Sequence, residues 1–527
     1  MCLVNHTSRL YVDHLHNPRL GTEAIPALSW EDRYKYLGCP TGSYRTPANV
    51  LNALRDGLLR DTGIVFSSQL AEWQKLDAFR KFLFPRLCFV LKVVFPGAIW
   101  CKKLDTALRT TIKRGPHLPP RACTKYFYLS QALGGLGIPS VEDESHVARA
   151  AQVYKFLADT RDPRITDVAL DQLKETVAKR ARHLDRTTPE GLMLFINSTS
   201  LPGEGRRPPE PLTWNKRKLL FQALQEEIHI RHLRDLKRTT DQGRAFDSVS
   251  LHPDSTFFIY TGAFLTFPQY RFIHRARLNL LPVCTVQALC HRPITNTQCR
   301  TCGRAPETLA HVLNHCHYNL GMARDRHNAI LERIVKAVPE FMGTKMKEQP
   351  LPGTGDNRPD LTIISPCGRK VMLVEVSCPF EGSPTALEDA AAHKVTKYEP
   401  LRRQLLQNYS EVTIHPFIVG SLGSWFPGND RVLSALRIGY KYAALMRRLC
   451  VVSAIARSQT IWYQAICKSH HRPAATHDNQ PSATTPPAAP GDQPTTTKSP
   501  TNQPTTTMPP AAPGGPPMGN SDQAVLA

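Results

Sequence analysis

The chain has 527 residues, of which 41% are hydrophobic, and its formal net charge is +22. At about 100–200 residues per domain, this length predicts two to four domains with real hydrophobic cores. An enzyme that acts on neutral substrates does not need so large a positive charge. The charge favours binding of polyanions, chiefly nucleic acid. No clean apolar run of about 20 residues is present, so we expect no membrane partner.

The 14 cysteines are not accompanied by a secretory signal. This combination favours a reducing compartment, in which thiols pack as apolar groups or bind metal, and the nucleus or cytoplasm follows as the expected location.

Short strand-like pieces occupy residues 1–45, and the pattern then becomes helical. Apolar residues recur every three or four positions, as in an amphipathic helix, at Leu70, Trp73, Leu76, Phe79 and Leu83. Basic residues between them leave two alternatives open, a solvated helix face or a track for a nucleic-acid backbone.

A Pro-rich stretch at 201–212 reads as a linker. Further along, PQYRFIHRARLNLLP at 268–282 predicts a helix that carries Arg271, Arg275 and Arg277, which we expect to bind nucleic acid. From residue 469 the composition collapses to Pro, Thr, Ala, Gly, Asn and Gln, which predicts a disordered tail over 469–527 because large apolar side chains are scarce.

Three cysteines and a histidine have the spacing C-x2-C-x8-H-x4-C, at Cys299, Cys302, His311 and Cys316. This donor set suits a tetrahedral, structural zinc ion, and the alternative is a chance cluster of buried thiols. We expect His311 and Cys316 on one face of a short helix. His315 and His317 flank Cys316, so an exchange of ligand stays open.

Two acidic residues follow in a hairpin-like pattern. Asp360 precedes the apolar run 361–364, and Glu375 lies within the run 371–376, with a Ser-Pro-Cys-Gly turn between them. Opposed on a hairpin, both carboxylates could bind one Mg²⁺, whose water would attack a phosphodiester.

The lysine that often follows the second acid of such a site by two residues is replaced by Ser377. Lys394 and Lys397 lie three residues apart on a predicted helix and could lean over the hairpin instead. The alternative is that Asp360 only starts a strand and that both lysines form a solvated face.

The motif order resembles a known family. RYKYLGCPTG, LAEWQKLDAFRKFLFPRL, YRFIHRARLNLLP, CRTCGRAPETLAHVLNHC, RHNAIL, RPDLTII, VEVSCPFE and AAAHKVTKYEPL are similar to motifs in the C-terminal half of the Pol polyprotein of type-1 non-LTR retrotransposable elements that insert into ribosomal RNA genes. The resemblance covers about residues 1–465.

This resemblance implies a domain order. It implies the end of a reverse-transcriptase palm at 1–45, a thumb with a helical extension at 46–200, a linker at 201–295, a zinc knuckle at 296–320 and a restriction-like, PD-(D/E)xK-type endonuclease at 321–468. The expected fold class is therefore multidomain α+β, with a mostly helical thumb and linker. No Asp-Asp dipeptide occurs in the chain, so the polymerase motif of the family is missing and we expect a fragment that does not polymerise.

The same resemblance implies roles for individual residues. It places zinc on the four Cys and His ligands, Mg²⁺ on Asp360 and Glu375, and the catalytic lysine on Lys394, with Lys397 as the alternative. Arg358 and Tyr398 are expected to contact nucleic acid. The implied partners are target DNA and element RNA, with a second copy of the full-length protein left open, and the implied location is the nucleus.

Two functions of different classes remain. The first is an Mg²⁺-dependent endonuclease that nicks target DNA for target-primed reverse transcription. The second is an inactive, nucleic-acid-binding relic of such an element. All three of Asp360, Glu375 and Lys394 are present, which favours the enzyme over the relic and over a basic scaffold protein.

Overall fold

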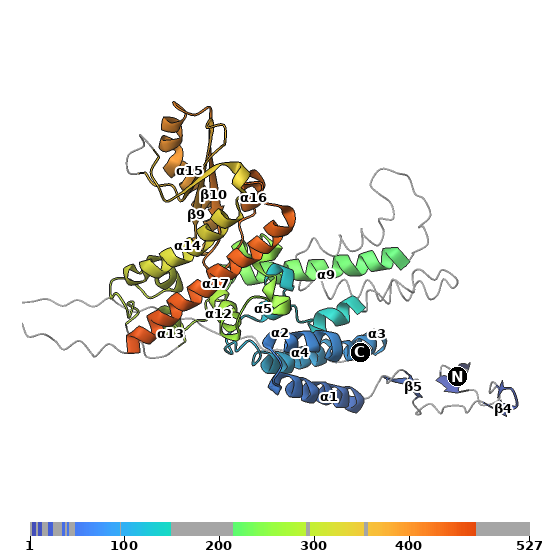
Figure 1. Ribbon diagram of the computed structural model, residues 1–527. Coiled ribbons are helices and arrows are strands. Elements are labelled where there is room, and N and C mark those ends of the chain that lie inside the picture. The colour runs from blue at the N-terminus through green and yellow to red at the C-terminus, as the bar shows by residue number, and fades with distance from the viewer. Residues whose placement is uncertain are drawn as a thin grey trace, which may run out of the picture. The chain divides into compact units, whose positions relative to one another are not determined.

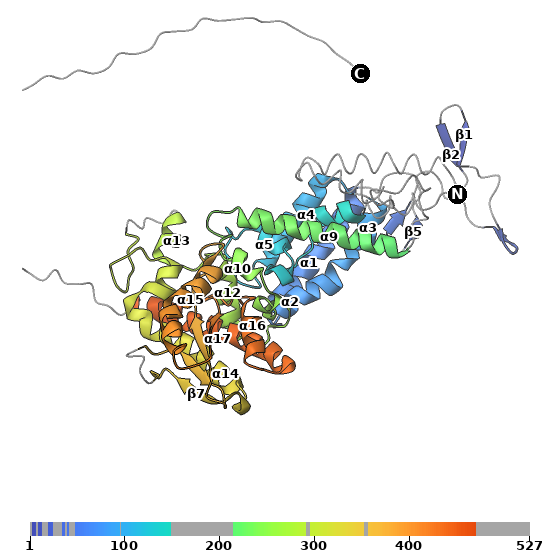
Figure 2. The same ribbon diagram turned by 90° about the horizontal axis from the view of Figure 1, so that it is seen from above.

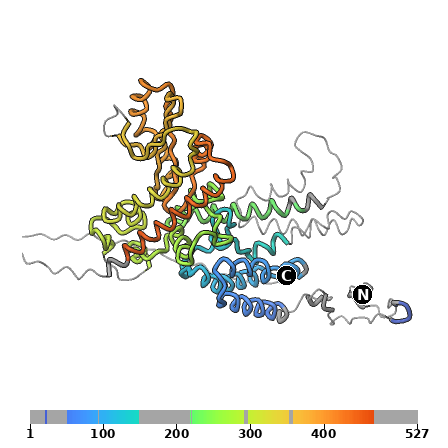
Figure 3. The backbone as a smooth tube through the Cα atoms, viewed as in Figure 1, coloured from blue at the N-terminus to red at the C-terminus, as the bar shows by residue number. Residues whose placement is uncertain are grey.

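The computed structural model describes residues 3–6, 9–12, 19–24, 34–36, 39–41, 48–94, 96–148, 214–290, 296–351 and 357–470 (Figures 1 and 3). Within these ranges the protein is rich in helices and has one four-stranded sheet. The predicted linker at 201–212 lies outside the described residues, as does the predicted tail from residue 471 onward.

Three short antiparallel strand pairs lie at the start of the chain. Their members are β1 (Leu3–His6) with β2 (Arg9–Val12), β3 (Arg19–Leu20) with β4 (Glu23–Ala24), and β5 (Tyr34–Tyr36) with β6 (Cys39–Thr41). The strand-like pieces predicted for residues 1–45 are therefore confirmed where these residues are described, and β5 pairs with β6 with Tyr36 opposite Cys39.

A helical region follows with its own hydrophobic core. Its elements are α1 (Ala48–Ser67), α2 (Glu72–Ala78), the π-helical turn Phe79–Leu83, α3 (Pro85–Val93), α4 (Ala98–Ile112) and α5 (Thr124–Tyr128), and residues 141–148 are also helical. The predicted apolar stripe is confirmed at Leu76, Phe79 and Leu83, which are buried. Leu70 is 44% exposed because it lies in the turn before α2 begins.

The next region joins the helical core to the sheet. It contains α9 (Trp214–Lys237), α10 (Phe246–Val249), α11 (Phe258–Thr261), α12 (Phe267–Arg277) and α13 (Cys284–Leu289). Helix α9 packs against α5, and α12 packs against α17 (Tyr440–His470) (Figure 2). Helix α12 has a capping box, in which Thr266 N–H donates to Gln269 Oε1 at 2.9 Å.

The sheet has the strand order β10-β9-β8-β7. Its strands are β7 (Thr344–Lys347), β8 (Leu361–Ile364), β9 (Lys370–Ser377) and β10 (Glu411–Ile418). Strands β7, β8 and β9 are antiparallel neighbours, whereas β10 is parallel to β9. A parallel neighbour requires a crossover, and α15 (Ala386–Leu405) supplies it. The edge position of β10 tolerates Pro416 in mid-strand.

Helices α14 (Leu320–Ala337), α16 (Asn429–Ala435) and α17 complete this part of the fold. A continuous core runs from α11 and α12 through α14 and the sheet to α17, with Trp425 and Phe417 fully buried in it. No helix in the described part of the chain is long and apolar enough to span a membrane.

Candidate catalytic site and metal centre

Asp360 and Glu375 face each other across the hairpin of β8 and β9. Leu361 pairs with Val374 in the antiparallel register, so the next pair outward brings the two acids together. Glu375 Oε1 accepts a hydrogen bond from Asp360 N–H at 3.1 Å, and Asp360 Oδ2 accepts one from Val376 N–H at 2.8 Å. The predicted hairpin is confirmed, and its backbone hydrogen bonds fix the positions of both carboxylates.

Lys394 comes to this pair from the crossover helix α15. Its Nζ lies 3.3 Å from Asp360 Oδ2 and 3.1 Å from Glu375 Oε2. Lys397 is instead exposed, with its ammonium 4.9 Å from the centroid of the Tyr398 ring. The sequence left open which of these two lysines reaches the acidic pair, and in the structure only Lys394 contacts the carboxylates.

A histidine that the sequence analysis did not single out completes the cluster. His327 on α14 places its Nε2 3.1 Å from Asp360 Oδ2, which requires Nε2 to carry the proton. Its Nδ1 lies 3.1 Å from Asn328 Oδ1. The only sequence signal was its position inside RHNAIL, a matched family motif to which no role had been given.

Burial and neighbouring charges move the pKa values of this cluster apart. Burial raises the pKa of Glu375, and the negative charge of Asp360 raises it further. Burial also opposes ionisation of Asp360, but the His327 hydrogen bond and the Lys394 charge outweigh it and hold the Asp360 pKa below its ordinary value. The same hydrogen bond outweighs burial at His327 and raises its pKa. Asp360 is thus the fixed anion of the site.

The predicted nucleic-acid contacts have different surroundings. Arg358 is exposed two residues before Asp360, so it is free to meet a ligand at this edge. Tyr398 is 5% exposed and packs in the core between α15 and the sheet, which corrects the expectation that it contacts DNA. Its ring lies beneath the two lysine side chains.

The arginines of α12 are mostly structural. Arg277 is 3% exposed and donates hydrogen bonds to the carbonyl oxygens of Ser255, Leu422 and Gly423 at 2.7, 2.9 and 3.2 Å. The prediction that Arg277 binds nucleic acid is therefore wrong, because its guanidinium is used inside the fold and burial lowers its pKa.

Arg271 and Arg275 are less buried than Arg277. Arg271 Nε donates to Glu72 Oε1 at 2.7 Å, and Arg275 Nε donates to the His117 carbonyl oxygen at 2.8 Å. Both side chains join α12 to the helical region, so the expected nucleic-acid role of these two arginines stays a prediction.

The four predicted zinc ligands converge. One donor atom from each of Cys299, Cys302, His311 and Cys316 lies within 4.8 Å of all the others. His311 Nε2 is 3.2 Å from Cys302 Sγ. Three sulfurs and one imidazole nitrogen at this spacing fit the tetrahedral geometry of a structural zinc ion. The cluster could therefore hold such a metal.

The local backbone around Cys316 differs from the expected α-helix. His311–His315 is one π-helical turn, and Cys316 follows it in extended conformation, with Cys316 N–H bonded to the His311 carbonyl at 2.7 Å. An i to i+5 hydrogen bond brings residues five apart onto the same side, which an α-helix would not do. This widened turn lets both ligands point into the cluster.

The Cys and His cluster is anchored to the hairpin of β8 and β9. Asn314 Nδ2 donates to the Cys378 carbonyl oxygen at 2.7 Å, just beyond the end of β9. The buried Arg326, next to His327 on α14, donates to the Leu313 carbonyl at 3.3 Å and to Ser458 Oγ at 2.9 Å. The cluster thus supports both elements that carry Glu375 and His327.

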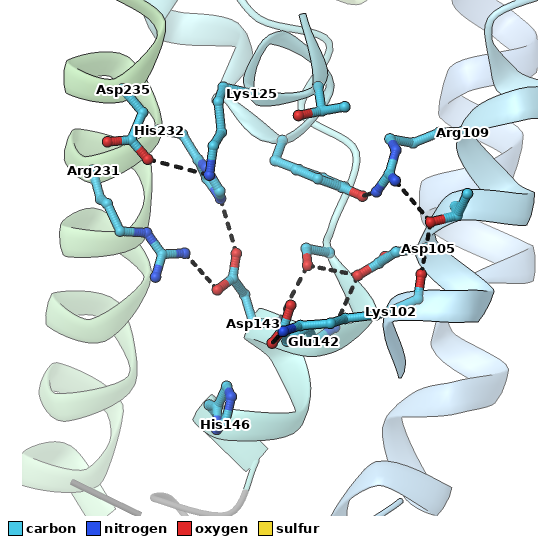
Figure 4. A pocket seen from close by; sticks show the side chains of 14 residues that line it. Lys102, Asp105, Arg109, Lys125, Glu142, Asp143, His146, Arg231, His232 and Asp235 are labelled. Atoms are coloured by element: carbon cyan, nitrogen blue, oxygen red, sulfur yellow. Dashed lines mark hydrogen bonds and ion pairs between the residues drawn. The ribbon is translucent and has the colours of Figure 1, made fainter. Parts of the chain in front are cut away.

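A separate polar cavity of about 390 Å³ lies among α4, α5, residues 140–146 and α9 (Figure 4). Asp105 accepts hydrogen bonds from Ser140 Oγ and Val141 N–H at 2.9 and 2.8 Å, and burial raises its pKa to about 6. Asp143 pairs with Arg231 at 2.5 Å and with His232 at 2.9 Å. These buried pairs join the helices around the cavity.

The chain was compared with known proteins. It is 24% identical over 432 residues to the retrovirus-related Pol polyprotein from type-2 retrotransposable element R2DM of Drosophila melanogaster, a match that covers 80% of the chain. It is 25% identical over 460 residues, or 86% of the chain, to the Pol polyprotein from type-1 retrotransposable element R2 of Popillia japonica. This chain is related to the R2 Pol polyproteins.

A third R2 Pol polyprotein, from Nasonia vitripennis, is 24% identical over 78% of the chain. The chain spans 37% of the Drosophila R2 protein and 36% of the Nasonia one, but 84% of the Popillia one. No family model matches the chain. The resemblance inferred from the motifs is confirmed by these R2 relatives.

Proposed function

We propose that this chain is an Mg²⁺-dependent endonuclease that nicks target DNA for an R2-like retrotransposable element. The observation that carries the proposal is the convergence of Asp360, Glu375 and Lys394, with Nζ–O distances of 3.3 and 3.1 Å. These groups lie on a β-hairpin and on the crossover helix behind it, an arrangement that we interpret as a restriction-like core.

The donor set supports a hard divalent cation at this place. Two carboxylates already converge on one cationic group, the Lys394 ammonium, and Mg²⁺ prefers such oxygen ligands. Asp360 and Glu375 would hold the ion. When bound, Mg²⁺ would supply neutralisation of the scissile phosphate and a water of lowered pKa.

The side chains of the site would divide the remaining work. Lys394 lies beside both carboxylates and would donate a hydrogen bond to the charge that develops on the phosphate. His327 fixes the orientation of Asp360 through Nε2–H. Arg358 is exposed where a DNA backbone would pass.

The test is a plasmid-nicking assay with purified protein in Mg²⁺ and in EDTA. We expect conversion of supercoiled to open-circular DNA in Mg²⁺, and loss of it in Asp360→Ala and Glu375→Gln. Circular dichroism and the zinc content of each variant check that it is folded. Nicking by Asp360→Ala at the wild-type rate would refute the assignment.

The R2 relationship supports the remaining parts of the proposal. Zinc would occupy the Cys299, Cys302, His311 and Cys316 cluster as a structural ion. Element RNA would be a second nucleic-acid partner, and the protein would act in the nucleus, where its DNA target lies. The net charge of +22 suits both partners.

A further inference from the structure

Aromatic side chains are exposed on the loop that joins α11 to α12 and at the helix ends beside it. Tyr260, Phe264 and Phe267 are 50%, 55% and 48% exposed. The half-buried Trp73 adjoins them, with its ring centroid 5.4 Å from that of Phe267, and Phe257 lies 6.3 Å from Phe264. We call Trp73, Phe257, Phe264 and Phe267 the aromatic platform. Large apolar side chains that gather on a surface usually mark a binding site.

The loop holds this platform in a defined and strained shape. Phe264 has φ +62°, a left-handed conformation that is unfavourable for a bulky side chain. Gly262 also has positive φ, and its Cα packs so closely on Trp73 that a Cβ would lie 2.3 Å from the ring. Strain of this kind persists where the surrounding structure enforces it, and it concentrates at functional sites. Here it holds the 55% exposed ring of Phe264 beside Phe257.

A basic group from α17 borders the platform. The Arg448 guanidinium lies 5.3 Å from the centroid of the Phe257 ring, and its side chain is 49% exposed. Its Nε also pairs with Asp254 Oδ1 at 3.2 Å, and that pair orients the guanidinium beside the ring. Rings beside cationic side chains are the combination that binds single-stranded nucleic acid, by stacking on bases and pairing with phosphates.

We propose that the aromatic platform binds single-stranded DNA by base stacking. The polar groups of the loop are engaged in its own structure: Thr261 Oγ1 accepts from Ala263 N–H at 3.2 Å, and Gln269 caps α12. The exposed rings of Phe264 and Phe267 carry no donor that would read base edges or a 2′-hydroxyl, so they offer only their faces to a ligand. The choice of DNA rests on the proposed function, since nicking frees a DNA strand end.

The experiment measures binding in the cleavage-deficient Asp360→Ala background, so that it does not depend on nicking. Fluorescence anisotropy would follow a labelled single-stranded DNA, and a 2-aminopurine in that DNA would report stacking. We expect Phe264→Gly and Phe267→Ala each to weaken binding by about tenfold and to reduce the 2-aminopurine quenching. Phe264→Gly also relieves the backbone strain, so its melting temperature should equal or exceed that of the parent.

The matched control is Phe341→Ala, which removes a phenylalanine that is 69% exposed on the turn Glu340–Met342. It should bind DNA like the parent. The proposal is overturned if the Phe264→Gly/Phe267→Ala double variant binds single-stranded DNA within twofold of the parent, or if it loses as much affinity for duplex DNA as for the single strand. It is also overturned if the double variant loses more affinity for single-stranded RNA than for single-stranded DNA, or if the parent self-associates through these rings. Failure of nicking with intact platform binding would refute only the nuclease.

Discussion

The ammonium of Lys394 lies 3.1 Å from the carboxylate of Glu375, although 19 positions separate the two residues in the chain. The geometry follows from the crossover between β9 and β10. Helix α15 must pass over the sheet to join two parallel strands, and it carries Lys394 back over the hairpin. Ser377, at the position where a lysine was missing, pairs with Ile418 as part of β9.

The two lysines of α15 should differ sharply in their effect on nicking. Lys394→Ala removes the ammonium group that contacts both carboxylates, and we expect the nicking rate to fall by about 100-fold or more. Lys397→Ala changes an exposed side chain and should retain the rate within about threefold while DNA affinity falls slightly. Single-turnover nicking rates at saturating DNA check this, and equal losses in both variants would contradict it.

His327 should act on catalysis through Asp360. His327→Ala leaves Asp360 without its imidazole partner, and loss of such an orienting partner typically costs about 10–100-fold in activity or metal affinity. The Mg²⁺ concentration for half-maximal nicking should rise in parallel. His393→Ala is the matched control, because His393 is exposed on α15 next to Lys394. An unchanged Mg²⁺ dependence in His327→Ala would argue against this role.

The Cys and His cluster should bind one zinc ion per chain. Cys302→Ser and Cys316→Ser each remove a ligand, so we expect loss of zinc by atomic absorption and a lower melting temperature. Cys367→Ser is the control, because Cys367 is exposed in the turn between β8 and β9. Full zinc retention in a Cys299→Ser/Cys302→Ser variant would exclude this ligand set.

The buried His274 should make the protein acid-sensitive. Burial lowers its pKa to about 3, whereas a histidine in the unfolded chain titrates near 6.5. Because the folded pKa is depressed, the unfolded chain binds one proton more between these values. Stability is then lost as the pH falls below about 6.5, by about 1.4 kcal/mol per pH unit for this one group.

This acid sensitivity is measured as the slope of the free energy of unfolding in urea against pH, between pH 6.5 and 4. The slope for the wild-type protein should exceed the slope for His274→Gln by about 1.4 kcal/mol per pH unit, which is the contribution of one proton. Zinc release affects both proteins alike and cancels in the difference. Parallel slopes would show that His274 is protonated in the folded state.

The sequence predicted the parts of the site that depend on local pattern. Two apolar runs around a Ser-Pro-Cys-Gly turn determine the hairpin and therefore the pairing of Asp360 with Glu375. Spacing also placed Lys394 and Lys397 on one helix, but it could not tell which of them reaches the acids, because that depends on the rotation of α15 over the sheet.

Contacts between residues far apart in the chain, and the burial of a charged side chain, could not be predicted from local sequence patterns. His327 is 33 residues from Asp360, and nothing local links them. Arg277 was expected at the surface because arginine seldom is buried, yet three carbonyl oxygens bind it inside the fold. We did not predict the π-helical turn before Cys316, because it differs from an α-helical turn by only one additional residue. The sequence spacing fits an α-helix well.

Asn314 and Arg326 join the Cys and His cluster to the two elements that carry the acidic site. Such a linkage makes the two regions one cooperative unit of local unfolding. The amide protons around Cys316, on α14 and in β9 should then exchange with solvent at one common free energy, and a chelator should lower that value for all three together. Loss of a single cysteine should then destabilise the hairpin of β8 and β9 without any change to Asp360, Glu375 or Lys394.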